Sequence, residues 1–344
     1  MAMNGHTRAK LRDFRPPLLV LRALGLGDLL TAVPALRGLR RAYPDYRTVL
    51  ACPSWLHPLA RITRALDDVI DVDGLAPFRG RLPPALAVNL HGRGPRSHRL
   101  LLAQRPLAIL AFAHSEIDET DDMPEWRDRE HEVARWCRLV RARGIACDPW
   151  DLDLDPSFLR GRAPACAVGA TVVHPGAASE ARRWPGERFA AVARAEVAQG
   201  RPVVVTGGPA DVDRCGLIAR RAALAEPCVF AGQTSALELA AVVAVAGRVV
   251  SGDTGVAHLA TALRRPSVVL FGPVPPSEWG PPPERGYHRA LWTGRRGDPH
   301  GDVVDPGLLE ISVQDVLATL DVLPTEPEPG ENHACWSFAR HVAR

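Results

Sequence analysis

An aspartate follows a glycine-rich turn near the start of the chain. The turn, Gly25-Leu26-Gly27-Asp28, comes directly after Leu18–Arg22, an apolar run typical of a strand buried on both faces. Leu30 stands where a dinucleotide fingerprint needs its third glycine, and the Asp28 carboxylate would repel a pyrophosphate at this helix N-terminus. This disfavours a NAD(P) dehydrogenase. A carboxylate here suits a general base, but the helix dipole alone also favours an acid at this position, and both interpretations stay open.

Two arginines follow a second junction between a strand and a loop. The run Val172–Ala177 predicts a strand that opens into a Pro-Gly turn, and Arg182 and Arg183 come before the next helix. Paired guanidinium groups at the carboxyl edge of a sheet can hold a diphosphate through bidentate hydrogen bonds. The alternative is a solvated basic loop.

An Asp-Thr-Gly sequence marks a third junction. It lies in Ser251–His258 and matches the aspartic-protease signature, but that site needs two aspartates and this single copy precedes a helix. A glycine-bracketed turn at a helix N-terminus instead offers backbone N–H groups to a phosphate. The candidate residues of this turn are Asp253, Thr254, Gly255 and His258.

Two further loops carry weaker signals. In Thr206–Pro209, Gly207 and Gly208 permit close backbone approach, and Asp211 can bind ribose hydroxyls; the alternative is a plain turn with a helix N-cap. The loop Asn89–Arg99 is rich in arginine and histidine, so it suits an anionic acceptor, unless it is merely solvated. The candidate residues on the acceptor side are Gly27, Thr31, His91, Arg93 and Arg96.

Strands alternate with helices in both halves of the sequence, which predicts an α/β protein with parallel sheets. The expected strands are Leu18–Arg22, Thr48–Cys52, Ala85–Leu90, Thr171–His174, Pro202–Thr206, Cys228–Phe230, Arg248–Ser251 and Ser267–Phe271. The main expected helices are Leu29–Arg41, Leu56–Ala65, His131–Gly144, Arg188–Gln199, Asp211–Leu224, Ser235–Ala246, Gly255–Leu263 and Ser312–Leu323.

An acidic, proline-rich stretch, 148–165, separates the two halves and predicts a connection. The expected units are residues 1–155 and 156–344, two Rossmann-like domains that face each other across a cleft. Whether the C-terminal helix packs back on the first domain stays open. The candidate residues cluster in loops at the carboxyl ends of strands, where such sheets bind ligands.

The composition excludes several classes of protein. The 344 residues include 42 basic and 39 acidic side chains, too balanced for an electrostatic nucleic-acid surface. No apolar run approaches the ~20 residues of a membrane helix, and the basic N-terminus lacks the apolar region of a secretory signal. Seven scattered cysteines without a C-x-x-C pair argue against disulfides and zinc. We expect a cytoplasmic protein with reduced thiols, no nucleic-acid partner and at most peripheral membrane contact.

Taken in order, these motifs resemble glycosyltransferase family 9, whose best-known members are the ADP-heptose–lipopolysaccharide heptosyltransferases. The resemblance runs from about Leu18 to Pro281, and the ordered set is specific although each motif alone is weak. The segments that carry it are LRALGLGDLLTAVPALRGLRRAYP, VNLHGRGPRS, VVHPGAASEARRWPGERFAAVAR, VVVTGGP and FAGQTSALELAAVVAVAGRVVSGDTGVAHLATALRRPSVVLFGPVPPSEWGP. It implies a GT-B fold, with an N-terminal acceptor domain and a C-terminal nucleotide-sugar domain.

The resemblance also implies an inverting transfer without a metal or other cofactor, from an ADP-linked sugar such as ADP-heptose. Asp28 matches the family's general base, and Arg182 matches its phosphate-binding basic residue, which is usually lysine. The phosphate-binding turn matches Asp253–His258, with Asp253 touching the sugar, and the ribose-binding acid is closest to Asp211. Asn89 departs from the family, because an aspartate is common there.

Two alternatives to sugar transfer remain. A GT-B nucleotide-sugar epimerase would convert the donor without an acceptor, and a nucleotide-sugar-binding homologue would have lost turnover. The order of the motifs argues against the first, and the retained Asp28 argues against the second. The acceptor is left open among a glycan, a lipid-linked molecule and a small molecule, and the family resemblance is compatible with a monomer.

Overall fold

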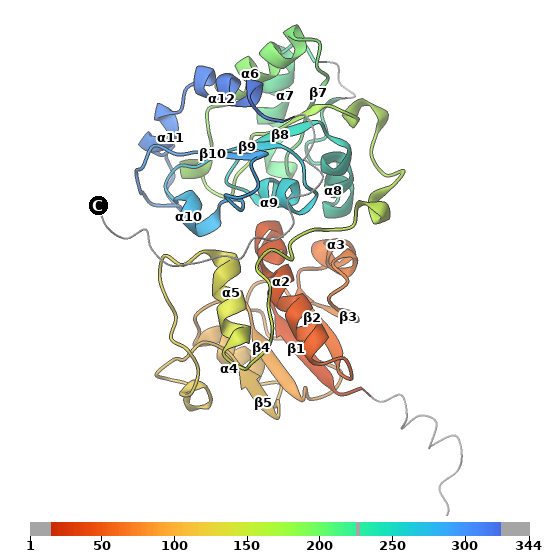
Figure 1. Ribbon diagram of the computed structural model, residues 1–344, viewed down its shortest axis with the longest axis vertical. Helices are drawn as coiled ribbons and strands as arrows, with labels where there is room; N and C mark the ends of the chain where they lie inside the picture. Colours follow the sequence, from red (N-terminus) through yellow and green to blue (C-terminus); the bar gives the residue numbers. More distant parts are fainter. Residues whose placement is uncertain (1–14, 225–227, 325–344) are drawn as a thin grey trace, which may run out of the picture.

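The computed structural model describes residues 15–224 and 228–324. In this part of the chain the strands form two five-stranded sheets, and every strand pair is parallel. Figure 1 shows the first sheet with its helices below the second. The expectation of an α/β fold with two Rossmann-like parallel sheets is confirmed.

The first sheet has the strand order β3-β2-β1-β4-β5. Its strands are β1 (Pro17–Leu21), β2 (Arg47–Cys52), β3 (Asp68–Asp71), β4 (Leu86–Asn89) and β5 (Ala108–Leu110). Alternate residues of β1 pack on opposite faces, with Leu18 and Val20 in one apolar cluster and Leu19 and Leu21 in another. The strand order reverses between β1 and β4, so the loops after these strands form the topological switch point.

The helices of the first half include one long element that follows β1. They are α2 (Leu26–Ala42), α3 (His57–Ile62), α4 (Arg96–Leu102) and α5 (Glu132–Arg141). Helix α2 begins at Leu26 rather than at Leu29, because Asp28 accepts a hydrogen bond from the Gly25 N–H and closes the first turn. Asp28 therefore lies in the first turn of the longest helix of this half.

The second sheet has the order β10-β9-β8-β6-β7. Its strands are β6 (Thr171–His174), β7 (Val203–Val205), β8 (Arg248–Gly252), β9 (Ser267–Leu270) and β10 (His288–Leu291). The strand expected at Cys228–Phe230 is reduced to a parallel bridge between Val205 and Val229. With this bridge, the second half follows the 3-2-1-4-5-6 order of a Rossmann domain, and its switch point lies between β6 and β8.

The helices of the second half cover this sheet and meet the first half. They are α6 (Gly186–Ala198), α7 (Val212–Arg221), α8 (Ala236–Val245), α9 (Gly255–Ala262), α10 (Pro276–Trp279), α11 (Pro306–Glu310) and α12 (Val313–Asp321). Helix α12 packs against α6 and β9, so the C-terminal helix covers the second sheet and does not cross back to the first. The tail after Pro324 lies outside the described residues.

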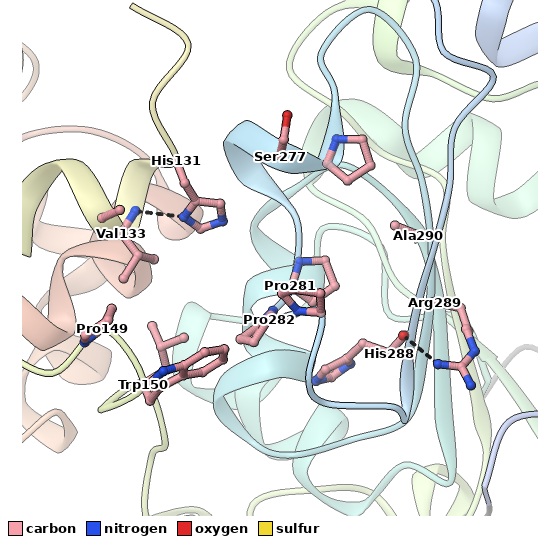
Figure 2. A pocket seen from close by; sticks show the side chains of 14 residues that line it. His131, Val133, Pro149, Trp150, Ser277, Pro281, Pro282, His288, Arg289 and Ala290 are labelled. Atoms are coloured by element: carbon pink, nitrogen blue, oxygen red, sulfur yellow. Dashed lines mark hydrogen bonds between the residues drawn. The ribbon is translucent and has the colours of Figure 1, made fainter. Parts of the chain in front are cut away.

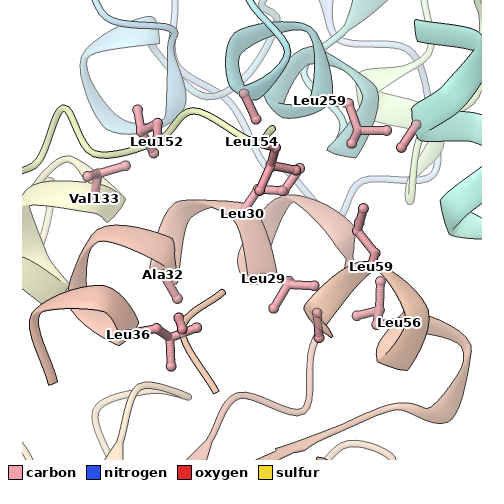
Figure 3. Packing of buried hydrophobic residues seen from close by; sticks show 14 of the residues in the cluster. Leu29, Leu30, Ala32, Leu36, Leu56, Leu59, Val133, Leu152, Leu154 and Leu259 are labelled. Atoms are coloured by element: carbon pink, nitrogen blue, oxygen red, sulfur yellow. The ribbon is translucent and has the colours of Figure 1, made fainter. Parts of the chain in front are cut away.

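One apolar cluster runs from the first half of the chain into the second. Leu30 of α2, Leu154 of the connection and Leu259 of α9 all belong to it (Figure 3). The Leu154 N–H donates to the Ala262 carbonyl at 2.7 Å, which ties the connection to α9. Helices α2 and α9, which follow the central strands β1 and β8, therefore pack directly against each other.

Several short elements escape the sequence pattern. Strand β3 has the sequence DVID and presents no apolar run, whereas β5 lies within the apolar run 107–113, which was not assigned to a strand. The connection contains single 3-10 turns at Pro156–Leu159 and Ala165–Ala167. Within the described residues, Cys52, Cys137, Cys147, Cys215 and Cys228 have free thiols, and Cys335 lies outside these residues. Within the same residues, none of the helices has the length and apolar character needed to cross a membrane.

Candidate active site

A cavity of about 420 Å³ lies between the switch points of the two sheets. The first half contributes Gly25, Leu26, Gly27 and Asp28, and the second contributes Arg182 together with Asp253, Thr254, Gly255 and His258. The remaining lining residues are Ala178, Val274, Trp279, Pro299 and His300. The volume falls within the range of about 300–1,000 Å³ that small-molecule sites occupy.

Glycines allow the two halves to approach closely at this cavity. A Cβ on Gly27 would lie 2.7 Å from Cδ2 of His258, and a Cβ on Gly255 would lie 2.7 Å from Cβ of Leu26. Any larger side chain at either position would force the first turns of α2 and α9 apart. Since the N-terminus of a helix carries partial positive charge, the cavity wall favours a negatively charged group.

Asp28 both caps its helix and faces the cavity. Its Oδ2 accepts the Gly25 N–H at 3.1 Å, and its Oδ1 accepts Nη2 of Arg22 at 3.1 Å. The side chain keeps 27% of its surface exposed. Asp28 can therefore both stabilise the helix N-terminus and act as a general base. The contact with the helix uses one carboxylate oxygen, and the carboxylate still lines the cavity.

Arg22 orients Asp28 through hydrogen bonds to its carboxylate and backbone carbonyl. The sequence analysis did not identify Arg22 as a site residue. Its guanidinium is fully buried, and its Nη2 also donates to Oε1 of Glu132 at 2.9 Å. Trp136 donates its indole N–H to the same Oε1 at 2.8 Å and stacks under the guanidinium at 4.8 Å. Burial would raise the pKa of Glu132, but Arg22 and Arg135 hold that pKa below its ordinary value. The sequence signal for Arg22 is a charge that ends an otherwise apolar strand.

Arg182 and Asp253 form an ion pair on the opposite wall. Nη2 of Arg182 donates to Oδ2 of Asp253 at 3.0 Å and also to the Asp253 carbonyl. Burial raises the pKa of Asp253, as does the nearby charge of Asp28, while Arg182 opposes the rise. Nε of Arg182 has no hydrogen-bond partner among the described residues, so the guanidinium keeps an unused donor.

The turn after Asp253 holds the N-terminus of α9. Thr254 is its N-cap, and its Oγ1 accepts the Val256 N–H at 3.3 Å. His258 lies one turn further along, edge-on to Trp279 with 5.9 Å between ring centroids. Burial, with a contribution from His131 and Arg182, lowers the pKa of His258 to about 3. Its imidazole is therefore neutral near pH 7.

Four other candidates of the second half do not line this cavity. Arg183 donates to the Ala177 carbonyl at 3.1 Å and to Glu180 at 3.0 Å, which stabilises its own loop. Asp211 accepts the Gly208 N–H at 3.0 Å and fills the space that a Cβ on Gly176 would need. Gly207, Gly208 and Asp211 follow β7, which lies two strands from β8 at the same edge of the sheet.

The acceptor-side candidates divide into two groups. Thr31 is buried beneath Asp28 and donates to its carbonyl at 3.0 Å, and His91 accepts the Ala23 N–H at 3.2 Å. Burial, with a contribution from Arg22, lowers the pKa of His91 to about 4. Arg93 is exposed in the loop after β4, and Arg96 is exposed as the first residue of α4.

Asn89 shapes the loop that carries Arg93 and leads into α4. Its amide nitrogen donates to the Gly92 carbonyl at 3.0 Å and to Oγ of Ser97 at 2.9 Å, while its oxygen accepts the His91 N–H at 2.9 Å. The loop is thus held by neutral hydrogen bonds from a fully buried side chain. Among the residues that the structure describes, no group of three or more His, Cys, Asp or Glu side chains is placed to hold a metal.

Comparisons with known proteins agree with this architecture. The model of glycosyltransferase family 9 (heptosyltransferase) matches residues 121–292. The chain is 31% identical to lipopolysaccharide heptosyltransferase 2 of Salmonella typhimurium, across 90% of this chain and 99% of that protein. It is 32% identical to lipooligosaccharide heptosyltransferase 2 of Haemophilus influenzae, across 42% of this chain, and this match spans less than half, 43%, of the relative's length.

A solved structure extends the likeness to the fold. The Escherichia coli ADP-heptose lipopolysaccharide heptosyltransferase II superposes with a TM-score of 0.71 at 21% identity, and 89% of this chain and 97% of that chain are covered. This likeness confirms the expected GT-B arrangement of two parallel-sheet domains. Together with the family model and the match along the Salmonella enzyme, it shows that the chain belongs to glycosyltransferase family 9.

Proposed function

We propose that this chain transfers a heptose from ADP-heptose to an acceptor hydroxyl, with inversion at the anomeric carbon and without a metal ion. The names of its relatives, which specify heptosyltransferases and ADP-heptose, support the donor. The observation that carries the proposal is that Asp28 of the first domain and Arg182 of the second line one cavity. A base and a cation on opposite walls suit a reaction that deprotonates one substrate and releases a diphosphate from the other.

Asp28 acts as the general base in this proposal. Its carboxylate takes the proton from the acceptor hydroxyl while the acceptor oxygen bonds to C1 of the heptose. The bond between C1 and the diphosphate oxygen breaks on the opposite face, and ADP leaves with the electron pair. Attack opposite the leaving group inverts the anomeric centre.

The second domain stabilises the negative charge that develops on ADP. Arg182 supplies a guanidinium, and Thr254 and Gly255 present the N-terminus of α9, so positive charge is fixed where the diphosphate leaves. The Asp253 carboxylate accepts hydrogen bonds from hydroxyl groups of the sugar. Gly207, Gly208 and Asp211, which follow β7, bind the ribose. Arg93 and Arg96 contact an anionic acceptor that is a glycan, a lipid-linked molecule or a small molecule.

Release of ADP from ADP-heptose, with lipopolysaccharide from the relatives' names as acceptor, tests the proposal. Asp28→Asn keeps the size of the side chain and should lower turnover by about 10²- to 10⁴-fold, the range expected for loss of a general base. EDTA should leave the rate unchanged, and NMR of the product should show the inverted anomer. Turnover in Asp28→Asn at the normal rate, or inhibition by EDTA, would contradict the mechanism. Isomerised ADP-heptose without acceptor would indicate an epimerase instead.

A further inference from the structure

A second cavity, of about 530 Å³, lies between the two domains (Figure 2). It shares no lining residue with the candidate active site. Its walls come from the start of α5, from the connection and from the segments around α10 and β10. Because both domains and the connection contribute, the cavity exists in this form when the domains are together.

A hydrogen bond between the domains stands at one side of this cavity. Nε2 of His131, at the N-cap of α5, lies 3.0 Å from the Gly280 carbonyl. Nδ1 of the same ring accepts the Val133 N–H at 3.3 Å, so Nε2 is the donor and both ring nitrogens are used. His131 is therefore a structural part of the wall and has no capacity left for a ligand.

Most of the remaining wall is apolar. Val133, Trp150, Leu152 and Pro282 are among the residues that line it, and Figure 2 shows Trp150 and Pro282 across the opening from His288. The proline rings present rigid apolar faces that suit a planar ring. A purely polar molecule would lose its hydration here without replacement hydrogen bonds.

His288 places a buried polar group without a hydrogen-bond partner in this apolar wall, among the described residues. It is 6% exposed, and its Nδ1 is hydrogen-bonded to Oγ of Ser267 at 2.8 Å. Its Nε2 is buried without a hydrogen-bond partner among the described residues. Burial, and to a lesser degree Arg285, lowers the pKa of His288 to about 3, so the ring is neutral. A neutral, unsatisfied ring nitrogen in a cavity wall is stabilised by a ligand that hydrogen-bonds to it.

Arg289 gives the cavity its charge. This residue is exposed, and the contact of its guanidinium is a 3.4 Å hydrogen bond to the His288 carbonyl. All the lining residues lie in the described part of the chain, and none of them is acidic. The cavity therefore combines an apolar interior, one hydrogen-bonding group without a partner among the described residues, and at its edge a positive charge that no acidic lining residue balances.

We propose that this interdomain cavity binds a small aromatic anion, whose ring lies against the prolines, whose polar atom meets Nε2 of His288 and whose anionic group pairs with Arg289. The site is separate from the sugar-transfer site and does not depend on the proposed function. A ligand that contacts both domains binds the closed arrangement more tightly than an open one.

The test is a fluorescence titration with 8-anilinonaphthalene-1-sulfonate, followed by competition with 2-naphthoate and with the neutral 2-naphthamide. The naphthoate should displace the probe about tenfold more effectively than the amide, because a charged hydrogen bond contributes about 1.4 kcal/mol or more. Arg289→Gln should remove this difference. Arg194→Gln, which removes an exposed arginine from α6 on the other side of the second sheet, is the matched control and should behave like the wild type.

Filling the cavity gives the second arm of the test. Ala134→Phe places a ring in the space lined by Ala134 and should weaken both naphthalene ligands by about tenfold or more. Saturating ADP should leave the probe bound. Displacement of the probe by ADP, or equal binding by wild type, Ala134→Phe and Arg289→Gln, would overturn the site. Since Arg289 is exposed, its variant keeps the test decisive even if Ala134→Phe fails to fold.

Discussion

The guanidinium of Arg22 holds Asp28 at two points: Nη2 donates to Oδ1 at 3.1 Å, and Nε donates to the backbone carbonyl at 2.9 Å. The same guanidinium is shared with Glu132, which is anionic and buried. Asp28 is thus fixed by a positive charge that is already balanced by a second carboxylate. The contacts that fix Asp28 therefore come from the protein itself.

Removal of Arg22 should destabilise the fold strongly. Arg22→Met leaves Glu132 buried with Arg135 as its remaining cation, and breaking a buried ion pair costs about 3–5 kcal/mol. Urea denaturation followed by circular dichroism measures the loss. The double variant Arg22→Met/Glu132→Gln should recover part of it, because the charge of Glu132 is then no longer buried without Arg22. A strictly additive double variant would show that the two residues are not coupled.

A methyl group at Gly27 should impair turnover without unfolding either domain. In Gly27→Ala the new Cβ would lie 2.7 Å from Cδ2 of His258, so α2 and α9 must separate slightly. Misplacement by about 1 Å can cost about 10²-fold in rate, which is the expected fall in kcat/KM. Gly286→Ala is the control, because a Cβ there meets nothing within 4 Å. Equal kinetics for the two variants would rule out tight packing as a requirement.

Substitution of the two neighbouring arginines should separate binding of the diphosphate from support of the loop. Arg182→Gln removes a charged hydrogen-bond donor worth about 1.5–3 kcal/mol, so ADP affinity should fall by at least about tenfold. The ADP affinity of Arg182→Lys should lie between those of the wild type and Arg182→Gln, since lysine keeps the charge but lacks the planar guanidinium. Arg183→Gln should leave ADP affinity nearly unchanged, because Arg183 pairs with Glu180 outside the cavity. Calorimetric titration with ADP measures all three, and a larger effect at Arg183 would reverse the assignment.

Stability should fall as the solution is acidified below pH 6.5. His174 is 8% exposed, its Nδ1 lies 2.9 Å from Oγ1 of Thr206, and burial lowers its pKa to about 4. The unfolded chain binds this proton near pH 6.5 and the folded chain only near pH 4, so the free energy of unfolding decreases through this window and is constant above it. One such group contributes a slope of up to about 1.4 kcal/mol per pH unit.

A matched variant isolates the contribution of His174. His174→Gln retains a hydrogen-bonding side chain but does not titrate, so its free energy of unfolding should depend less on pH between 6.5 and 4 than that of the wild type. Denaturation at several pH values measures the two slopes. Parallel curves for the two proteins would mean that His174 carries no proton in the unfolded state that it lacks in the folded one.

The sequence predicted the parts of the fold and site that depend on local pattern. Apolar runs such as Leu18–Arg22 end in glycine-rich loops, and parallel sheets bring such loops to one edge, so Asp28, Arg182 and Asp253 could be placed near the cleft. Strand β3, with an aspartate at each end, gave no such pattern, and β5 was overlooked although it lies in the apolar run 107–113.

Contacts between distant residues could not be predicted in this way. Arg22 and Glu132 are 110 positions apart and meet only because α5 packs beside α2. Leu30, which breaks the dinucleotide fingerprint, turned out to be part of the core between the domains. Gly27 and Gly255 matter because a Cβ at either position would clash with a residue of the other domain. Neither sequence motif reveals this contact alone.

The apolar cluster shared by α2, the connection and α9 affects how the protein unfolds. Leu30 and Leu259 are each at most 2% exposed, and drawing one half away would uncover both at a cost of about 25 cal/mol for each Å² of apolar surface. Neither half keeps its own surface covered when the other melts. We therefore expect the two sheets to unfold as one cooperative unit when the protein is heated or exposed to denaturant.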